Sequence, residues 1–417
     1  MKAILTAVAV MSTCVLGACS ADGGAGNQDV GGAGNSVESG SVGTSQPTQT
    51  TKGDPIPAPS TAPASDSTAG SGTSTPTQTP APAPTSAPTD APAPTTPAPT
   101  PTTPAVGMPY RGINLSGGEF GVTIPGTFGK EYTFPTNAEV DYYMSKGMTT
   151  FRVGFLWERI QAAAYGELDA TYAGRLDAIV NYASSKGAKV IIEPHNFARY
   201  YGSTVGSAQV PNGVFADFWK RLSSRYATDM NVMFNLVNEP HDINSEQWVG
   251  AANAAIAAIR GAGAHNTIVV PGNAWTGAHA WYDTSYGTSN AVALLNVVDS
   301  ENNMLFEAHQ YLDSNSSGGG GTCVSATIGS QRLAPFVKWL RENGKKGIVG
   351  EFAGANNATC NAAVTDMLTY MAAQPEIVGW QWWGGGPWWG EYPFTLEPTG
   401  TTDRPQMSLL LPFLSGT

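Results

Sequence analysis

The sequence predicts an α/β fold, a single closed barrel of eight parallel strands and surrounding helices (a TIM barrel), over residues 107–417. Three observations favour it. Eight short apolar runs recur along this part of the chain, segments with helical spacing lie between several of them, and the runs end in polar or aromatic side chains. Continuous apolar runs are typical of parallel strands that are covered on both faces. Their alternation with helices indicates a barrel, a fold that spans about 200 to 400 residues.

The expected strands follow one another at intervals that leave room for a helix. The fourth, residues 232–237, leads into Asn238 and Glu239 and is stopped by Pro240. Proline has no N–H to donate to a sheet, and it favours an extended backbone at the residue before it, here Glu239. The seventh strand repeats this design and ends in Glu351. The series is 110–115, 150–155, 189–194, 232–237, 267–271, 304–308, 347–352 and 377–382.

Apolar residues at helical spacing predict helices over 172–186, 249–262 and 330–343. Gly187 and Gly344 follow the first and the third, and glycine is favoured just beyond helix ends. Right-handed crossovers bring the carboxyl ends of all parallel strands to one mouth of a barrel. The side chains expected at this mouth are Asn114, Arg152, His195, Asn196, Asn238, Glu239, Trp275, His309, Tyr311, Glu351 and Trp383.

Composition separates the first 106 residues from the barrel. Residues 1–18 resemble a bacterial signal peptide of the lipoprotein type, because an apolar run ends in Leu-Gly-Ala before Cys19, the expected lipidation site. The alternative is an ordinary signal peptide, and the run is too short to span a membrane. Residues 19–106, rich in Gly and Ser and then in Pro, Thr and Ala, predict a disordered linker that reaches about 200 Å. We expect an exported protein, anchored in the outer membrane as a lipoprotein or secreted after release.

Only two of the four cysteines remain in the folded part once Cys14 and Cys19 are assigned to the export signal. An exported chain with one remaining pair favours a disulfide between Cys323 and Cys360, and two free thiols are the alternative. Such a bridge contributes about 3–4 kcal/mol to stability. Both cysteines are expected in loops, after the sixth and the seventh strand, close to Glu351.

Charge and motifs limit the classes of function. A net charge of −11 and a pI near 4.9 disfavour nucleic acids and anionic membrane surfaces as partners and are compatible with a neutral polymer. The five histidines show no H-E-x-x-H or paired metal spacing, and the folded part has no G-x-S-x-G motif. We therefore expect neither metal nor cofactor. Two carboxylates at strand ends on one face are what glycosidic bond cleavage needs, and a non-catalytic glycan-binding barrel is the rival from another class.

Several segments at the expected mouth together resemble glycoside hydrolase family 5, and most of all its cellulase branch of bacterial and fungal endoglucanases. The resemblance covers the folded part, and the full set of motifs in this order is highly specific. The segments are PHNFARY at 194–200, LVNEP at 236–240, HQYLD at 309–313, GEF at 350–352 and the tryptophan-rich eighth strand.

The resemblance implies a retaining mechanism with two carboxyl groups about 5–5.5 Å apart. Glu239 would be the general acid and then the base, and Glu351 the nucleophile that forms a glycosyl-enzyme. Glu351 must stay ionised beside a cation and a hydroxyl donor, and the resemblance nominates Arg152 and Tyr311; a buried ion pair of the barrel is the alternative role for Arg152. The other residues that it implies are Asn238, which contacts the sugar 2-hydroxyl, and the positioning histidines His195 and His309.

Aromatic side chains complete the expected site. Trp383 resembles the floor on which the cleaved sugar stacks, and Trp275 and Trp388 would extend this platform unless they pack in the core. Trp380 and Trp382 have the opposite strand parity and are expected behind it. Five further carboxylates lie near the mouth but in none of the catalytic motifs, and these are Glu119, Glu193, Glu307, Glu391 and Glu397.

The resemblance therefore implies an endo-acting β-1,4-glucanase that hydrolyses cellulose or soluble β-glucan and works as a monomer. The alternative substrates are other plant-wall β-glycans, namely mannan, xyloglucan and mixed-linkage glucan, because specificity lies in the loops.

Overall fold

The computed structural model describes residues 108–414, and these residues form a closed barrel of eight parallel strands, as predicted. The predicted signal peptide (1–18), its lipidation site Cys19 and the linker (19–106) lie outside the described residues. Within the described range, no helix combines the length and the apolar character that a membrane crossing requires.

The barrel strands hydrogen-bond in the order β1-β10-β9-β8-β7-β6-β3-β2, with β2 closing back on β1. All eight follow one another in chain order around this ring, while β4 and β5 form a separate small hairpin. The bounds are β1 Tyr110–Gly118, β2 Thr150–Phe155, β3 Lys189–Pro194, β4 Arg199–Tyr200, β5 Ser203–Thr204, β6 Val232–Asn235, β7 Ile268–Pro271, β8 Met304–His309, β9 Gly347–Phe352 and β10 Ile377–Gly385.

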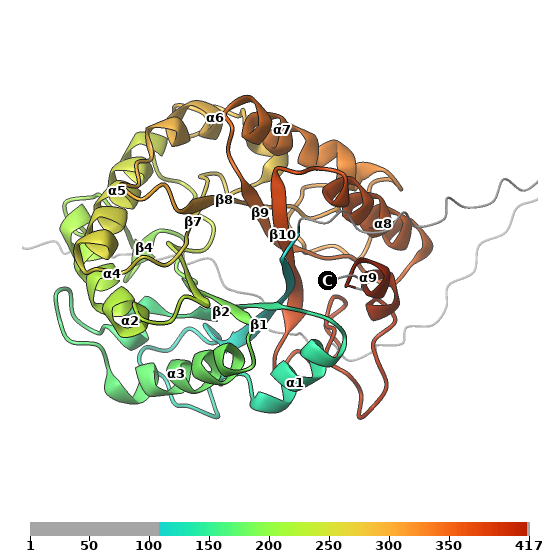
Figure 1. The fold of residues 1–417 in the computed structure, drawn as a ribbon, viewed down its shortest axis with the longest axis horizontal. Coiled ribbons are helices and arrows are strands. Elements are labelled where there is room, and N and C mark those ends of the chain that lie inside the picture. The colour runs from blue at the N-terminus through green and yellow to red at the C-terminus, as the bar shows by residue number, and fades with distance from the viewer. Residues whose placement is uncertain (1–107, 415–417) are drawn as a thin grey trace, which may run out of the picture. The chain divides into compact units, whose positions relative to one another are not determined.

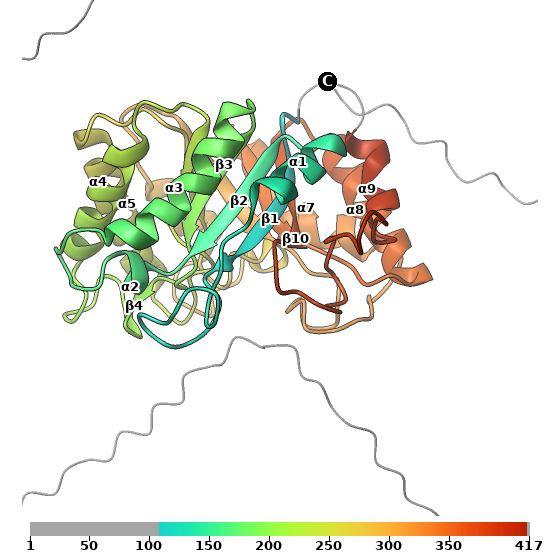
Figure 2. The same cartoon turned by 90° about the horizontal axis from the view of Figure 1, so that it is seen from below.

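Helices surround the strands as an outer ring (Figure 1). The long loops that follow the strands gather with β4 at one end of the barrel, opposite the end where the described chain finishes (Figure 2). The helices are α1 Asn137–Ser145, α2 Trp157–Ile160, α3 Ala170–Ser185, α4 Asn212–Tyr226, α5 Ser245–Gly261, α6 Asn290–Ala293, α7 Ile328–Glu342, α8 Ala358–Ala372 and α9 Met407–Leu414, with short 3-10 turns at Ala278–Ala280 and Leu294–Asn296.

Most predicted elements are present, and their ends differ for identifiable reasons. Helix α5 starts four residues earlier than predicted because the Asn244 side chain caps it, accepting hydrogen bonds from the N–H groups of Glu246 and Gln247. Strand β6 is shorter than predicted, and β10 extends to Gly385. The β4–β5 hairpin was not predicted, because strands of two residues carry no periodic signal.

Two layers of side chains fill the barrel interior. We call the first, near the amino ends of the strands, the lower layer; its five members pack together in a cluster separate from the core under the helices. Side chains two residues apart on a strand share a face, so the next inward residues lie one step closer to the mouth. The lower layer is Ile191, Met233, Val269, Leu305 and Ile348, and the upper layer is Arg152, Glu193, Asn235 and Glu307.

Candidate active site

Glu239 stands at the mouth in a strained turn. We predicted an extended backbone before Pro240, and that prediction is wrong: Glu239 has φ +41°, in the left-handed region that non-glycine residues rarely adopt. The surroundings impose this conformation, because the N–H of Asn238 donates to the carbonyl of Pro194 and the N–H of Trp275 donates to that of Pro240. Strain of this kind is typical of functional sites, and here it turns the carboxylate toward His309.

Glu351 reaches the same space through an irregularity in β9. Ala308 pairs with Val349, but the next residue of β8, His309, pairs with Glu351, so the ladder skips Gly350. A bulge of this kind changes which face the following side chain occupies. Ile348 belongs to the inward lower layer, and strict alternation would turn Glu351 outward. The skipped glycine lets Glu351 point inward, where it is buried.

The two carboxylates and His309 form a compact group. An oxygen of Glu239, an oxygen of Glu351 and a ring nitrogen of His309 all lie within 4.8 Å of one another. His309 Nδ1 lies 2.8 Å from Glu239 Oε1 and 3.5 Å from Glu351 Oε2. The separation of the carboxylates agrees with the short spacing of retaining glycosidases, about 5–5.5 Å, and is below the 6.5–9.5 Å of inverting ones.

Arg152 links several residues by hydrogen bonds beneath Glu239, Glu351 and His309. Its Nη1 donates to Glu351 Oε1 and to Asn114 Oδ1, both at 2.9 Å, and its Nη2 donates to Asn238 Oδ1 at 2.8 Å. The same guanidinium lies 3.4 Å from Glu193 and 3.2 Å from Glu307. A buried ion pair of the barrel therefore does not describe all the contacts of Arg152. It also contacts Glu351 and the amide of Asn238, the residue before Glu239.

His195 and Asn238 continue the network on the β3 side. His195 Nδ1 lies 2.8 Å from Glu193 Oε1, and Asn238 Nδ2 lies 3.1 Å from His195 Nε2. Because the amide oxygen of Asn238 accepts from Arg152, its amide nitrogen faces His195. The ring of His195 also stacks on Trp383, with centroids 5.7 Å apart and planes inclined by 21°.

The carboxyl groups of Glu239 and Glu351 have different surroundings. Burial raises the pKa of Glu239, and the charge of Glu351 raises it further, although the His309 hydrogen bond acts against both. Glu351 accepts a hydrogen bond from Arg152 at 2.9 Å and another from the hydroxyl of Tyr311 at 2.8 Å. Burial and the charge of Glu351 hold the pKa of Tyr311 well above its usual value, so its hydroxyl remains a donor.

Aromatic rings line the mouth on the β10 side. Trp383 is partly exposed, while Trp380 and Trp382 are fully buried, as their strand parity predicted. Trp389 packs edge-on against Trp383 at 5.6 Å and stacks on Tyr392. Trp388 is 46% exposed and therefore does not pack in the core. These rings present apolar faces on which a pyranose can stack.

A second exposed aromatic platform lies beyond Pro240. Trp275 is 44% exposed and stacks on His241, with centroids 4.4 Å apart and planes nearly parallel at 7°. Tyr286 contacts it edge-on. The sequence reasoning included Trp275 but missed His241, since a histidine that follows a catalytic motif carries no signal of its own.

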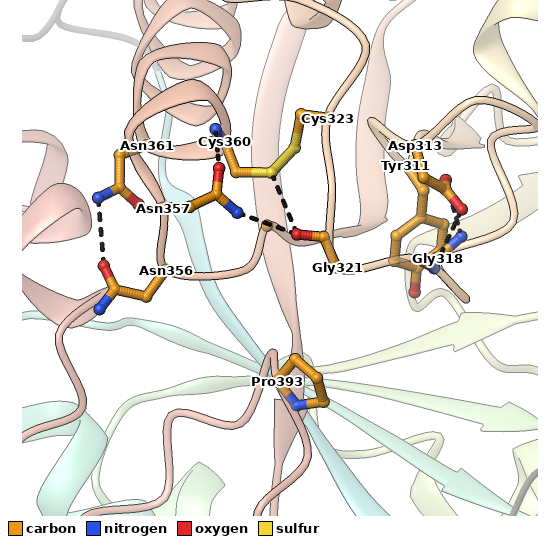
Figure 3. The surroundings of a disulfide bond; sticks show 12 residues. Tyr311, Asp313, Gly318, Gly321, Cys323, Asn356, Asn357, Cys360, Asn361 and Pro393 are labelled. Carbon is orange, nitrogen blue, oxygen red and sulfur yellow. Dashed lines mark hydrogen bonds between the residues drawn. A yellow bond between two sulfur atoms is a disulfide. The ribbon is translucent and has the colours of Figure 1, made fainter. Parts of the chain in front are cut away.

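A disulfide joins Cys323 to Cys360, with sulfur atoms 2.05 Å apart (Figure 3). Cys323 lies in the loop after β8, as predicted, whereas Cys360 lies in the first turn of α8 and not in a loop. That helix begins early because the Asn357 side chain caps it by accepting from the N–H of Cys360. The Asn357 amide also donates to the carbonyl of Gly321, so the bridge and this hydrogen bond tie the loop to α8.

Glu239, Glu351 and His309 also have the spacing that a bound cation requires. Burial lowers the pKa of His309, but the charge of Glu351 and contacts with Glu239 and Glu307 outweigh it and raise this pKa to about 10. The raised pKa fits an imidazole that shares a proton at Nδ1 with the two carboxylates.

Sequence reasoning undervalued two carboxylates. Glu193 and Glu307 were set aside because neither lies in a catalytic motif, yet both are buried against Arg152, and each contacts the histidine two residues further along its strand. The spacing Glu-x-His at two strand ends was the available signal. By contrast, Glu391 is exposed and pairs with Arg404, well outside this network.

Comparison with known proteins agrees with this geometry. Residues 106–386 match the family model described as cellulase, glycosyl hydrolase family 5. The chain belongs to this family. An endo-beta-1,4-glucanase B of Aspergillus niger is 40% identical over 306 residues, which are 73% of this chain and 89% of that protein.

Solved structures of family 5 members extend the likeness to the whole barrel. An endo-beta-1,4-glucanase of Xanthomonas axonopodis pv. citri is 46% identical, with a TM-score of 0.72 over 74% of this chain and 98% of that chain. The structure of XacCel5A in complex with cellopentaose is 45% identical, with the same TM-score over 73% of this chain and 99% of that chain.

Proposed function

We propose that this family 5 glycoside hydrolase is an endo-β-1,4-glucanase that cleaves internal bonds of cellulose or soluble β-glucan with retention of configuration. One observation carries the mechanism: carboxylate oxygens of Glu239 and Glu351 lie within 4.8 Å of each other, which suits double displacement. The substrate class rests on the endoglucanase relatives and on the cellopentaose that XacCel5A binds.

In the first step, Glu239 donates its proton to the glycosidic oxygen while Glu351 attacks the anomeric carbon. The bond between that carbon and the leaving oxygen breaks, and an ester bond to Glu351 forms. The shorter sugar chain leaves with the proton as a new alcohol. In the second step, the ionised Glu239 takes a proton from water, the water oxygen attacks the same carbon, and the ester bond to Glu351 breaks. Two inversions restore the original configuration.

The neighbours of each carboxylate suit these roles. Arg152 and Tyr311 orient Glu351 and stabilise the charge that returns to it when the ester breaks. His309, positioned at 2.8 Å from Glu239, stabilises that carboxylate after it has given up its proton. The amide nitrogen of Asn238 faces His195 and would bind the sugar 2-hydroxyl, and Trp383 beside His195 would support the ring from below.

An endo mode and a β-1,4-glucan are tested together by product sizing. Purified enzyme acting on carboxymethyl cellulose should release reducing ends while viscosity falls steeply, and cellopentaose should be cut to shorter oligosaccharides. Mannan, xyloglucan and mixed-linkage glucan, assayed in parallel, test the alternative specificities. Failure to release reducing ends from any β-1,4-linked glucan would overturn the proposal, and stepwise release of cellobiose alone would overturn the endo mode.

We further propose that the enzyme is a bacterial exported monomer, anchored through Cys19 and held away from the membrane by the 19–106 linker. The lipobox-like end of the leader and the Pro/Thr-rich composition support this. Radiolabelled fatty acid should enter the full chain and the Cys14→Ser variant but not Cys19→Ser. A label that persists in Cys19→Ser, or fails to enter the unchanged chain, would refute the anchor.

A further inference from the structure

We infer that Glu307 is a positioning residue for the glucanase reaction, holding Arg152 beside Glu351 and His309 beside Glu239 from the upper layer of the barrel. The inference rests on the function proposed above. Glu307 itself does not contact the expected position of the sugar, since its side chain is fully buried beneath the two catalytic carboxylates.

The contacts of Glu307 favour an ionised carboxylate. Its Oε1 lies 3.2 Å from Arg152 Nε and 3.5 Å from His309 Nε2, and its Oε2 accepts from Asn235 Nδ2 at 2.5 Å. All three neighbours are hydrogen donors. Among the described residues, Arg152 Nε and His309 Nε2 have no regular hydrogen bond, so the nearby Glu307 oxygen is what compensates them.

The size of Glu307 also explains a residue of the catalytic motif. A Cβ added at Gly350 would come within 1.9 Å of Glu307 Oε1 and 2.9 Å of its Cγ, so Glu307 would have to leave its place beside Arg152 and His309. Gly350 is the residue skipped in the β8–β9 ladder, and this bulge turns Glu351 toward the mouth. Glu307, Gly350 and the orientation of Glu351 therefore form one arrangement.

The same carboxylate fixes the orientation of His309. With Nε2 directed at Glu307, the ring presents Nδ1 to Glu239 and Glu351 on its other side. These three carboxylates are the charged groups that face the imidazole, with Arg152 directly behind Glu307. Loss of the Glu307 charge should therefore free the ring to turn and should weaken its hold on a second proton.

Glu307→Gln keeps the size of the side chain and removes its charge. Its NH2 group replaces one of the two oxygens, and the oxygen that remains is neutral, so Arg152 and His309 lose the charge that holds them. We expect kcat to fall about 100-fold, since displacements near 1 Å have effects of this size, while KM changes less than twofold. Asp299→Asn is the matched control, because the buried Asp299 carboxylate also pairs with an arginine, Arg260, and no site residue contacts it. Equal kcat in Glu307→Gln and Asp299→Asn would overturn the inference.

NMR of ¹⁵N-labelled histidines supplies a measurement that needs no substrate. In the unchanged enzyme His309 should carry both protons at pH 7, and in Glu307→Gln its pKa should be lower by at least one unit. A neutral His309 in the unchanged enzyme, or an identical titration in both proteins, would refute the role of Glu307 even if the variant is poorly stable. If the unchanged enzyme cleaves no glucan although His309 titrates as expected, the proposed function fails and the contact with Glu307 stands.

Discussion

The lower layer of the barrel interior is apolar, whereas the upper layer, one step nearer the mouth, is polar and mostly charged. Ile191 is followed by Glu193 on β3, Met233 by Asn235 on β6, and Leu305 by Glu307 on β8. One closed sheet supports both layers, and its β8–β9 ladder shifts register between Ala308 and His309. The change in chemistry therefore comes from the side chains within one fold, together with the register shift that turns Glu351 inward.

The two layers contribute differently to the protein: the lower layer to its stability and the upper layer to its reactivity. The lower layer removes apolar surface from water with no polar atom to satisfy. The upper layer places the Arg152 guanidinium beside two of its own carboxylates, Glu193 and Glu307, and below a third, Glu351, so the charges repel as well as attract. Buried ion pairs of this kind contribute little net stability but fix geometry. Changes near the mouth should thus affect turnover, and changes in the lower layer should affect unfolding.

The largest effect is expected for Glu351→Gln. Without a nucleophile no glycosyl-enzyme forms, and kcat should fall on the order of 10⁴-fold or more. Because the variant also relieves repulsion around Arg152, its unfolding free energy in guanidinium chloride should equal or exceed that of the unchanged enzyme. In Glu351→Ala, azide should restore cleavage and yield a glycosyl azide of inverted configuration. Substantial turnover in Glu351→Gln, or loss of its folding, would contradict the division between the layers.

Glu239→Gln should cost about 10²–10⁴-fold on cellulose, because general acid catalysis to the leaving oxygen is lost. The loss should be much smaller for the first step with an aryl cellobioside whose leaving group needs no proton. Burial raises the pKa of Glu239, so the acid form persists above its usual range and activity is lost as the pH rises through the raised value. Glu239→Gln should therefore lack this alkaline limb of kcat/KM. A limb that survives unchanged would assign it to another group.

Much of this arrangement follows from sequence because it depends on short periodic signals. Buried strands read as continuous apolar runs, and a barrel sends the residues at their ends to a single mouth, so the placing of His309 and Glu351 needed no coordinates. Arg152, also expected at a strand end, lies in the middle of β2 and reaches the site from the upper layer. The family resemblance then supplied a role for each residue.

The remaining features depend on contacts between distant strands. The positive φ of Glu239 opposes the local preference before proline and is held by Trp275 and Pro194, neither of which is adjacent in sequence. The bulge at Gly350 lies between β8 and β9, and Glu307 of β8 fills the space that a Cβ at this position would need. Glu307 itself has no motif, so its importance is visible only when its three partners are placed around it.

The lower layer supplies the opposite test. Ile348→Ala leaves a cavity among apolar neighbours and should reduce the unfolding free energy by about 2–5 kcal/mol. At a temperature where the variant is folded, kcat should stay within about twofold of the unchanged enzyme, because the ladder that carries Glu351 is retained. Chemical denaturation and initial rates on the same sample measure both quantities. A large loss of kcat without loss of stability would mean that the layers are coupled.

The disulfide is an exception to the comparison between the two layers. It lies on the mouth side of the barrel, yet we expect it to act on stability. It closes a loop across 37 residues, and the double variant Cys323→Ala/Cys360→Ala should lose about 2–4 kcal/mol of unfolding free energy. The loop held by the disulfide packs on the ring of Tyr311, since a Cβ at Gly318 would come within 2.7 Å of that ring. A modest fall in kcat should therefore accompany the loss of unfolding free energy. The unchanged enzyme in reductant is the control and should match the variant. Equal denaturation midpoints with and without reductant would show that the bridge adds nothing, and that packing alone holds the mouth loops in place.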